Sequence, residues 1–107
     1  MATFEGPTNR LYRKIPMTVQ AIQWDGSIKS AGEIIEWIEE FNPGPDKIKF
    51  LETNETPDRT APLILLNTNQ GPSYAKATDW IVWGTQNDVY PVTDEVFKDV
   101  FEKLVTV

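Results

Sequence analysis

The stretch that decides the fold is Tyr74–Phe101, whose sequence is YAKATDWIVWGTQNDVYPVTDEVFKDVF. It contains two strand-like runs, Asp79–Gly84 and Asp88–Val92, separated by three polar residues. Asparagine accepts the left-handed backbone conformation that a tight hairpin needs, so Asn87 is expected at the positive-φ position. This stretch therefore predicts an antiparallel hairpin that helps to close the sheet.

A short helix is predicted directly after the hairpin. Thr93 is a favourable N-cap residue, and Asp94 and Glu95 place negative charge at the positive end of the helix dipole. Four apolar residues at helical spacing are expected to form its inner face: Val96, Phe97, Val100 and Phe101. The last residues, Leu104–Val107, are suited to an edge strand that returns to the sheet.

Towards the N-terminus, Met17–Trp24 begins with the alternation of apolar and polar residues that is typical of a β-strand. The alternation breaks where Ile22 and Trp24 fall on the polar face. Either a bulge lies near Ala21, or both faces of the strand are buried there.

The segment after this strand predicts the most regular helix of the chain. Its apolar residues recur at helical spacing: Ile34, Ile35, Trp37, Ile38 and Phe41. Ser30 and Glu33 fit a capping box at its start, whereas Ser27 fits an N-cap for a slightly earlier start. The Pro- and Gly-containing segment Asn42–Pro45 ends the helix.

The middle of the chain predicts further strands. Ile48–Leu51 is either a short strand or an extended segment, and Glu52–Thr60 is predicted as a surface loop. Leu63–Leu66 is a continuous apolar run, typical of a strand that is covered on both faces. Asn67–Gly71 then predicts a hairpin loop that leads into a strand at Ser73–Ala77.

The order of these elements predicts an α+β fold, in which two helices pack on one face of a mostly antiparallel sheet. A chain of 107 residues with 40% hydrophobic and 11% aromatic residues can bury the core of a single domain. Residues 1–11 carry Gly6 and Pro7 without any periodic pattern. We therefore expect a loose lead-in at 1–11 and one domain at 12–107.

Composition excludes several kinds of chemistry. The sequence contains no histidine and no cysteine, so Ser-His-Asp, Cys-His and thiolate-zinc sites cannot be assembled. The net charge of −6 disfavours general binding to nucleic-acid phosphates. We therefore expect neither enzymatic activity nor a cofactor. No apolar run reaches the length of a membrane span, and the N-terminus lacks a signal-peptide pattern, so we expect a cytoplasmic protein.

Two groups of short motifs stand out along the chain. The first combines Tyr12–Pro16 with Ala21–Gly26, and the second combines Asp79–Gly84 with Tyr90-Pro91 and Phe97. Their order and spacing resemble a widespread family of small bacteriophage and prophage proteins. Its members open with Tyr-Arg-Lys-x-Pro and an Ala-x-Gln-Trp strand, and close with Pro-Gly-Asp-Trp or Pro-Gly-Asp-Tyr, a Tyr-Pro pair and a Phe. The resemblance implies a viral or prophage origin and a small α+β fold, and it implies no catalytic residues.

The chain departs from the pattern of that family at two turns. Ala77-Thr78 stands where the family has Pro-Gly, so this turn must form without the conformational freedom of glycine. Asn87 stands where the family has the hairpin glycine, which is physically compatible because asparagine tolerates positive φ.

Four aromatic residues are candidates for a ligand or partner site: Trp24, Trp80, Trp83 and Tyr90. Aromatic residues on strands beside a helix are more often core, so we favour packing for most of them. Trp80 and Trp83 are an odd number of positions apart, so on a regular strand they face opposite sides. We expect Trp83 to be the partly exposed one, and an exposed tryptophan indicates an interface.

Three charged residues near these motifs are further candidates. Arg13 and Lys14 can bind a phosphate or a carboxylate, although we favour a solvated pair that balances the acidic surface. Asp79 can serve as a general base or a metal ligand, but we favour a side-chain hydrogen bond to the turn at the strand entrance.

The leading functional hypothesis is a non-catalytic binding module from a phage genome that acts on a host protein or a small molecule. The residues expected at its site are Trp83, Arg13, Lys14, Trp24 and Tyr90. The alternatives are a virion assembly or decoration component, and a protein that sequesters a nucleotide defence signal. The expected location is the host cytoplasm, with the virion as the alternative. Open sheet edges are compatible with a homo-oligomer, and no membrane partner is expected.

Overall fold

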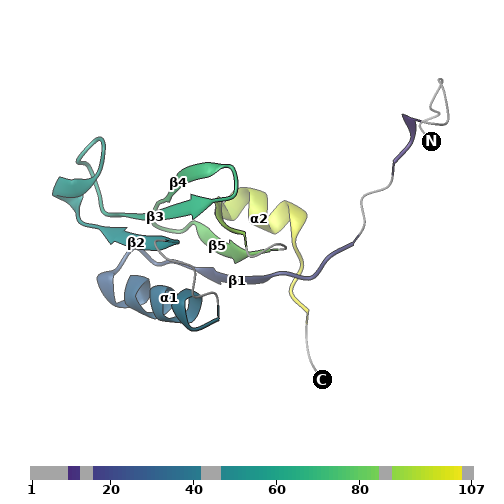
Figure 1. The fold of residues 1–107 in the computed structure, drawn as a ribbon, viewed down its shortest axis with the longest axis horizontal. Helices are drawn as coiled ribbons and strands as arrows, with labels where there is room; N and C mark the ends of the chain where they lie inside the picture. Colours follow the sequence, from purple (N-terminus) through teal and green to yellow (C-terminus); the bar gives the residue numbers. More distant parts are fainter. Residues whose placement is uncertain (1–9, 13–15, 42–46, 85–87, 105–107) are drawn as a thin grey trace.

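The computed structural model describes residues 10–12, 16–41, 47–84 and 88–104. Figure 1 shows two helices and two small sheets. In chain order the elements are β1 (Gln20–Gln23), α1 (Ile28–Phe41), β2 (Ile48–Leu51), the 3-10 helix η2 (Thr53–Glu55), β3 (Leu63–Thr68), β4 (Gly71–Ala75), β5 (Trp80–Trp83), β6 (Val89–Val92) and α2 (Asp94–Val100). The predicted α+β class is confirmed.

The six strands form two three-stranded antiparallel sheets, with the orders β1-β5-β6 and β2-β3-β4. The first sheet joins the N-terminal strand to the β5–β6 hairpin, with Gln23 opposite Trp80 and Trp80 opposite Val92. The second sheet is a meander, in which β3 lies between β2 and β4. β6 also contacts β3 and β4, so the two sheets meet along this strand.

The core lies between α1 and the two sheets. Its buried members are Trp24, Ala31, Ile34, Ile38, Ile48, Ile64, Leu66, Ala75, Ile81 and Val89. They come from α1, both sheets and the Trp24 turn, so this cluster holds the separate elements together. Alternation along β3 places Ile64 and Leu66 in this core, while Leu63 and Leu65 are half-buried.

The two helices cover opposite faces of the β1-β5-β6 sheet, whereas one shared face was expected. Ile81 packs in the core with α1, and its neighbour Trp80 points to the other face and stacks on Phe97 of α2. Their ring centroids are 3.9 Å apart with an interplanar angle of 6°. Figure 1 shows α1 and α2 on the two sides of this sheet. Consecutive apolar residues on β5 require cover on both faces, which explains the difference.

Ser27 caps α1, and the alternative capping box at Ser30 and Glu33 was wrong. The Ser30 N–H donates to Ser27 Oγ at 3.1 Å, and the Ala31 N–H donates to the Ser27 carbonyl at 3.1 Å. Asp25 Oδ1 accepts from the N–H and the hydroxyl of Ser27 at 2.8 and 2.6 Å. These hydrogen bonds, first the one from the Ser27 hydroxyl, hold the pKa of Asp25 below its ordinary value.

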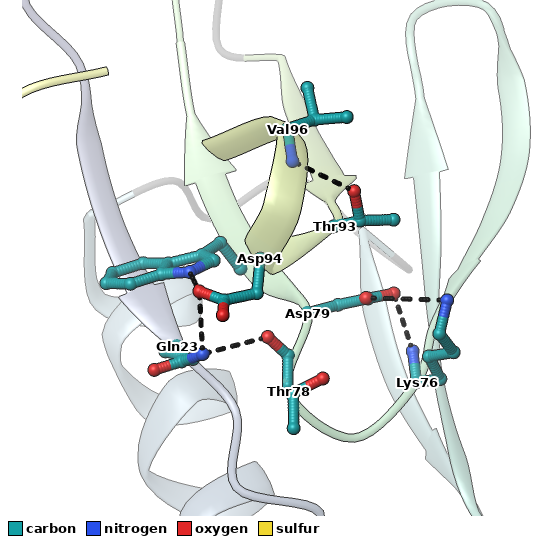
Figure 2. Close-up of polar contacts among 8 residues, drawn as sticks. Gln23, Lys76, Thr78, Asp79, Thr93, Asp94 and Val96 are labelled. Carbon is teal, nitrogen blue, oxygen red and sulfur yellow. Dashed lines mark hydrogen bonds and ion pairs between the residues drawn. The ribbon is translucent and has the colours of Figure 1, made fainter. Parts of the chain in front are cut away.

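Thr93 caps α2 as predicted, because its Oγ1 accepts from the Val96 N–H at 3.3 Å (Figure 2). The predicted inner face of this helix was half wrong. Phe97 and Phe101 are half-buried and stack on each other at 4.8 Å, but Val96 and Val100 are 50% and 57% exposed. Neighbouring residues are rotated by about 100° around a helix, so Val96 and Val100 turn away from the sheet when Phe97 and Phe101 pack on it.

Some of the predicted elements begin or end at other residues in the structure. The strand expected at Met17–Trp24 is paired as β1 only from Gln20 to Gln23. Leu104 is exposed and outside any strand, and Asn87 and 105–107 lie outside the described residues.

Trp24 continues the pairing of β1 with β5 by one residue and forms the joint between two turns. Its N–H donates to the Asp79 carbonyl at 3.0 Å, and its own carbonyl accepts from the Thr78 N–H at 2.8 Å. Beside it, Gly26 has a φ of +92°, and a Cβ there would lie 2.8 Å from the Ala77 Cβ. Glycine is therefore required at 26 both for its backbone and for this close approach.

Thr78 takes the position of the missing glycine in the second turn, with a φ of 76°. A β-branched residue is strained in the left-handed region. The turn is held in this conformation by the backbone bonds of Thr78, whose carbonyl also accepts from Gln23 Nε2 at 3.0 Å. The turn at Ala77-Thr78 therefore forms without glycine, as expected, and Thr78 adopts a strained backbone conformation there.

Thr78→Gly is expected to raise the free energy of unfolding by about 0.5–1 kcal/mol, because it removes left-handed strain and keeps every backbone hydrogen bond. Urea unfolding followed by tryptophan fluorescence measures the change. The matched control is Thr60→Gly, at an exposed threonine that is not among the positive-φ residues, and it is expected to lower the stability. Equal destabilisation by both variants would contradict strain at Thr78.

Candidate functional site

The two tryptophans predicted for the site belong to the hydrophobic core or pack on it. Trp24 is fully buried, and its Nε1 donates to the Ser27 carbonyl at 2.8 Å, so it cannot reach a ligand. Trp83 is half-buried and packs edge-to-face on Trp37 of α1, with ring centroids 5.9 Å apart. Trp83 and Trp80 are therefore both partly covered, Trp83 by α1 on one face of the sheet and Trp80 by α2 on the other.

Tyr90 is half-buried at a shallow cleft between the β3–β4 hairpin and β6, with a volume of about 460 Å³. Ser73 and Asp88 also line this cleft, and among the described residues no lysine or arginine does. Burial, and then the charge of Asp88, raises the pKa of the Tyr90 hydroxyl. Asp88 Oδ1 accepts from the Asn69 N–H at 2.7 Å, which ties the β3–β4 turn to the base of the β5–β6 hairpin.

Three of the five predicted site residues, Trp24, Trp83 and Tyr90, are described by the structure. Trp24 and Trp83 lie in or against the core, and Tyr90 lies at the cleft. Arg13 and Lys14 lie outside the described residues. A site that combines them with Arg13 and Lys14 therefore stays a prediction.

Asp79 makes the turn bond that was expected of it. It is only 4% exposed, and its Oδ2 accepts from the Lys76 N–H at 3.0 Å (Figure 2). Its Oδ1 has no hydrogen bond and lies 3.8 Å from Lys76 Nζ. Among the described residues, no group of three or more acidic side chains is placed to hold a metal ion. The carboxylate of Asp79 therefore supports the β4–β5 turn.

A second carboxylate, Asp94, joins three elements on the α2 side of the sheet. Its Oδ1 accepts from Trp80 Nε1 at 2.9 Å and from Gln23 Nε2 at 3.2 Å, and Gln23 also reaches the Thr78 carbonyl (Figure 2). Its Oδ2 pairs with Lys98 Nζ at 2.9 Å. We name Gln23, Trp80, Asp94 and Lys98 the Asp94 clasp. It fixes the start of α2 to β1 and β5.

Two of the motif segments, Ala21–Gly26 and Asp79–Gly84, therefore meet in space where the first ends and the second begins. Gln23–Gly26 lies against Ala77–Trp80 through the backbone bonds of Trp24, the close approach of Gly26 to Ala77, and the clasp. Their polar groups are used in contacts within the chain. These contacts give the order and spacing of the two segments a structural explanation.

Comparison with family models, with curated proteins and with solved structures found no match to this chain. In the part of the chain that the structure describes, no helix has the length and apolar character needed to cross a bilayer.

The surface feature that the sequence analysis missed is the outer side of α2. Val96 and Val100 lie one helical turn apart and are half-exposed, and the carboxylates Glu95 and Asp99 beside them are exposed. We call these four residues the α2 outer face. The signal was present in the sequence, because 96 and 100 form a second i, i+4 line next to Phe97 and Phe101.

The pKa of Asp94 gives a test of the clasp. Hydrogen bonds, first from the Trp80 indole and then from Lys98, hold it below the ordinary value of 3.8. A carboxylate whose pKa is lowered by folding stabilises the protein above its unfolded pKa, and this contribution is lost as the pH falls through the folded pKa.

Wild type is therefore expected to be more stable than Asp94→Asn at neutral pH, and the difference is expected to shrink below pH 3.8. Urea unfolding at a series of pH values measures it. Asp99→Asn is the control, because the side chain of Asp99 makes no hydrogen bond or ion pair in the described part of the chain. A gap between wild type and Asp94→Asn that is independent of pH would exclude an ionised Asp94 as the centre of the clasp.

Proposed function

We propose that this protein is a non-catalytic, phage-type binding module that engages a host protein through the α2 outer face. The observation that carries the proposal is the pair of half-exposed valines on a short, acidic helix. Most exposed apolar residues occur singly and need no explanation, but two on adjacent turns form a small apolar strip. The resemblance of the motifs to phage proteins supports the origin, and the absence of histidine and cysteine supports a role without catalysis.

The charges around this strip indicate the chemistry of the partner. Glu95 and Asp99 directly precede Val96 and Val100 along the helix, and the chain as a whole has a net charge of −6. The first turn of α2 carries two acidic residues, and Lys98 is engaged by Asp94. An apolar groove rimmed by lysine and arginine would match this surface, in the manner of a helix that lies in a groove of its partner.

The fold supports such a role because it presents α2 on a rigid base. Thr93 caps the helix, the Asp94 clasp fixes its first turn, and Phe97 and Phe101 anchor its inner side. The ordering entropy of these residues is therefore already lost before a partner binds, which favours affinity.

The cleft at Tyr90 gives less support to the alternative of nucleotide sequestration. Its lining offers an aromatic ring and hydroxyls but an acidic side chain, Asp88, in place of a cation. A nucleotide phosphate would meet negative charge there.

Val96→Gln/Val100→Gln is expected to weaken binding of the partner, because the polar side chains remove the apolar contact. The charge of the helix is unchanged in this variant. The protein is immobilised, incubated with lysate of the bacterial host, and the bound proteins are identified and purified for titration calorimetry. The expected loss of affinity is about tenfold or more, since each valine contributes on the order of 1 kcal/mol.

Two further variants separate the contributions to this binding. Glu95→Gln/Asp99→Asn is expected to weaken binding mainly at low salt, because it removes only charge. Glu36→Gln/Glu40→Gln makes a similar change in charge at exposed positions of α1 and is the matched control. If the bound proteins are the same for wild type and for the valine variant, the α2 outer face is not the binding surface.

A further inference from the structure

Each of the two sheets has two edge strands, and these strands differ in how well they are protected against pairing with another strand. β1 and β6 are the edges of one sheet, and β2 and β4 are the edges of the other. An edge strand presents unpaired N–H and C=O groups that can template another strand. Natural proteins protect such edges with proline, with charged side chains or with a covering segment.

Three of the four edges carry such protection. β2 contains the exposed Lys49, β4 contains the exposed Pro72, and β6 contains Pro91 and is also contacted by the second sheet. β1 has neither a proline nor a charged residue. Met17–Val19, which leads into β1, also contains no proline and no charged residue. Within the described residues, β1 is therefore the one edge open to a further strand.

The free hydrogen-bonding groups of this edge follow from the pairing of Trp24. Its N–H and C=O point towards β5, and in an antiparallel ladder the residues that exchange hydrogen bonds with one neighbour alternate. The N–H and C=O groups of Ile22 and Gln20 therefore also point towards β5, where these residues lie opposite Ile81 and Trp83. The N–H and C=O of Ala21 and Gln23 point to the open side.

The strand pattern of the sequence extends further than the pairing within the chain. β5 ends at Trp83 opposite Gln20, so Met17–Val19 runs past the end of its neighbour. Figure 1 shows that residues 16–19, directly before β1, continue in line with the strand and away from both sheets. Met17 is 47% exposed and Ile22 is 37% exposed. A strand-like sequence with exposed apolar residues thus lacks a partner in the described part of the chain.

Charge selects the kind of strand that this edge fits. The chain has a net charge of −6, so two copies repel each other over most of their surfaces. Met17–Gln23 contains no charged residue, and pairing this segment with itself brings no like charges together.

We propose that Met17–Gln23 pairs antiparallel with the same segment of a second copy, so that two three-stranded sheets join into one of six strands. A two-fold axis at Gln20 places Val19 opposite Ala21, and Met17 opposite Gln23, of the partner subunit. Every residue with outward-pointing N–H and C=O groups then faces another such residue, as an antiparallel ladder requires. The surface is separate from the α2 outer face, so this inference stands independently of the proposed function.

Self-pairing of β1 is tested by placing charged side chains at position 20, on the proposed two-fold axis. Gln20 is exposed, and in the paired dimer its side chain lies directly opposite Gln20 of the partner subunit. Gln20→Lys and Gln20→Glu each place two like charges in opposition, whereas an equal mixture of the two variants places opposite charges there. Light scattering on a sizing column and sedimentation equilibrium give the mass and the dissociation constant.

Wild type is expected at twice the chain mass. Each charged variant alone is expected to weaken the dimer roughly fivefold or more, and mixing the two is expected to restore it. Ala21→Pro removes an outward N–H that β5 does not use and is expected to give a monomer with an unchanged circular dichroism spectrum. Tyr74→Lys adds charge to the protected β4 edge and is expected to leave the mass unchanged.

Three results would overturn the proposal. Wild type that remains a monomer at millimolar concentration shows that β1 does not pair with a second copy, and leaves a strand of another protein as its occupant. A dimer that survives both charged variants and Ala21→Pro uses another surface. A mixture that stays as weak as its components shows that the two Gln20 side chains do not face each other. Since the chain has no cysteine, a spin label on Gln20→Cys measures this last distance directly.

Discussion

The backbone bonds and the buried ring of Trp24 are the interaction on which the rest of the structure depends. Trp24 continues the β1–β5 pairing, its indole lies in the core, and its Nε1 holds the Ser27 carbonyl at the start of α1. The two turns that it joins approach so closely that Gly26 has no room for a side chain. The strained backbone of Thr78 is tolerated because this joint holds it in place.

Local signals in the sequence predicted most of the elements and their caps. The Thr93 cap, the Ser27 alternative and the strand at Leu63–Leu66 follow from residue type and spacing over a few positions. The division into two sheets did not follow, because strand partners are chosen by contacts far apart in the sequence. Alternation placed Trp80 and Trp83 on opposite faces, but only the positions of the helices show that both are covered.

The candidate site was predictable to a smaller degree, for a physical reason. The residues with the most chemical character, such as Trp24 and Asp79, were prominent in the sequence but are used inside the fold. The surfaces that remain free consist of ordinary residues: two valines on α2 and an uncharged strand edge at β1. Such features are recognised only when the structure shows which faces and edges stay uncovered. The two proposals, partner binding at the α2 outer face and self-pairing at β1, use these two separate surfaces.

Amide hydrogen exchange tests most directly whether Ala21–Gly26 and Asp79–Gly84 form a structural joint around Trp24. The amides of Trp24 and Thr78 are hydrogen-bonded across the joint, so they are expected to exchange only through global unfolding, as slowly as the amides of the core strand β3. Exchange of these two amides at the rate of the exposed Glu52–Thr60 loop, while β3 stays protected, would contradict the account.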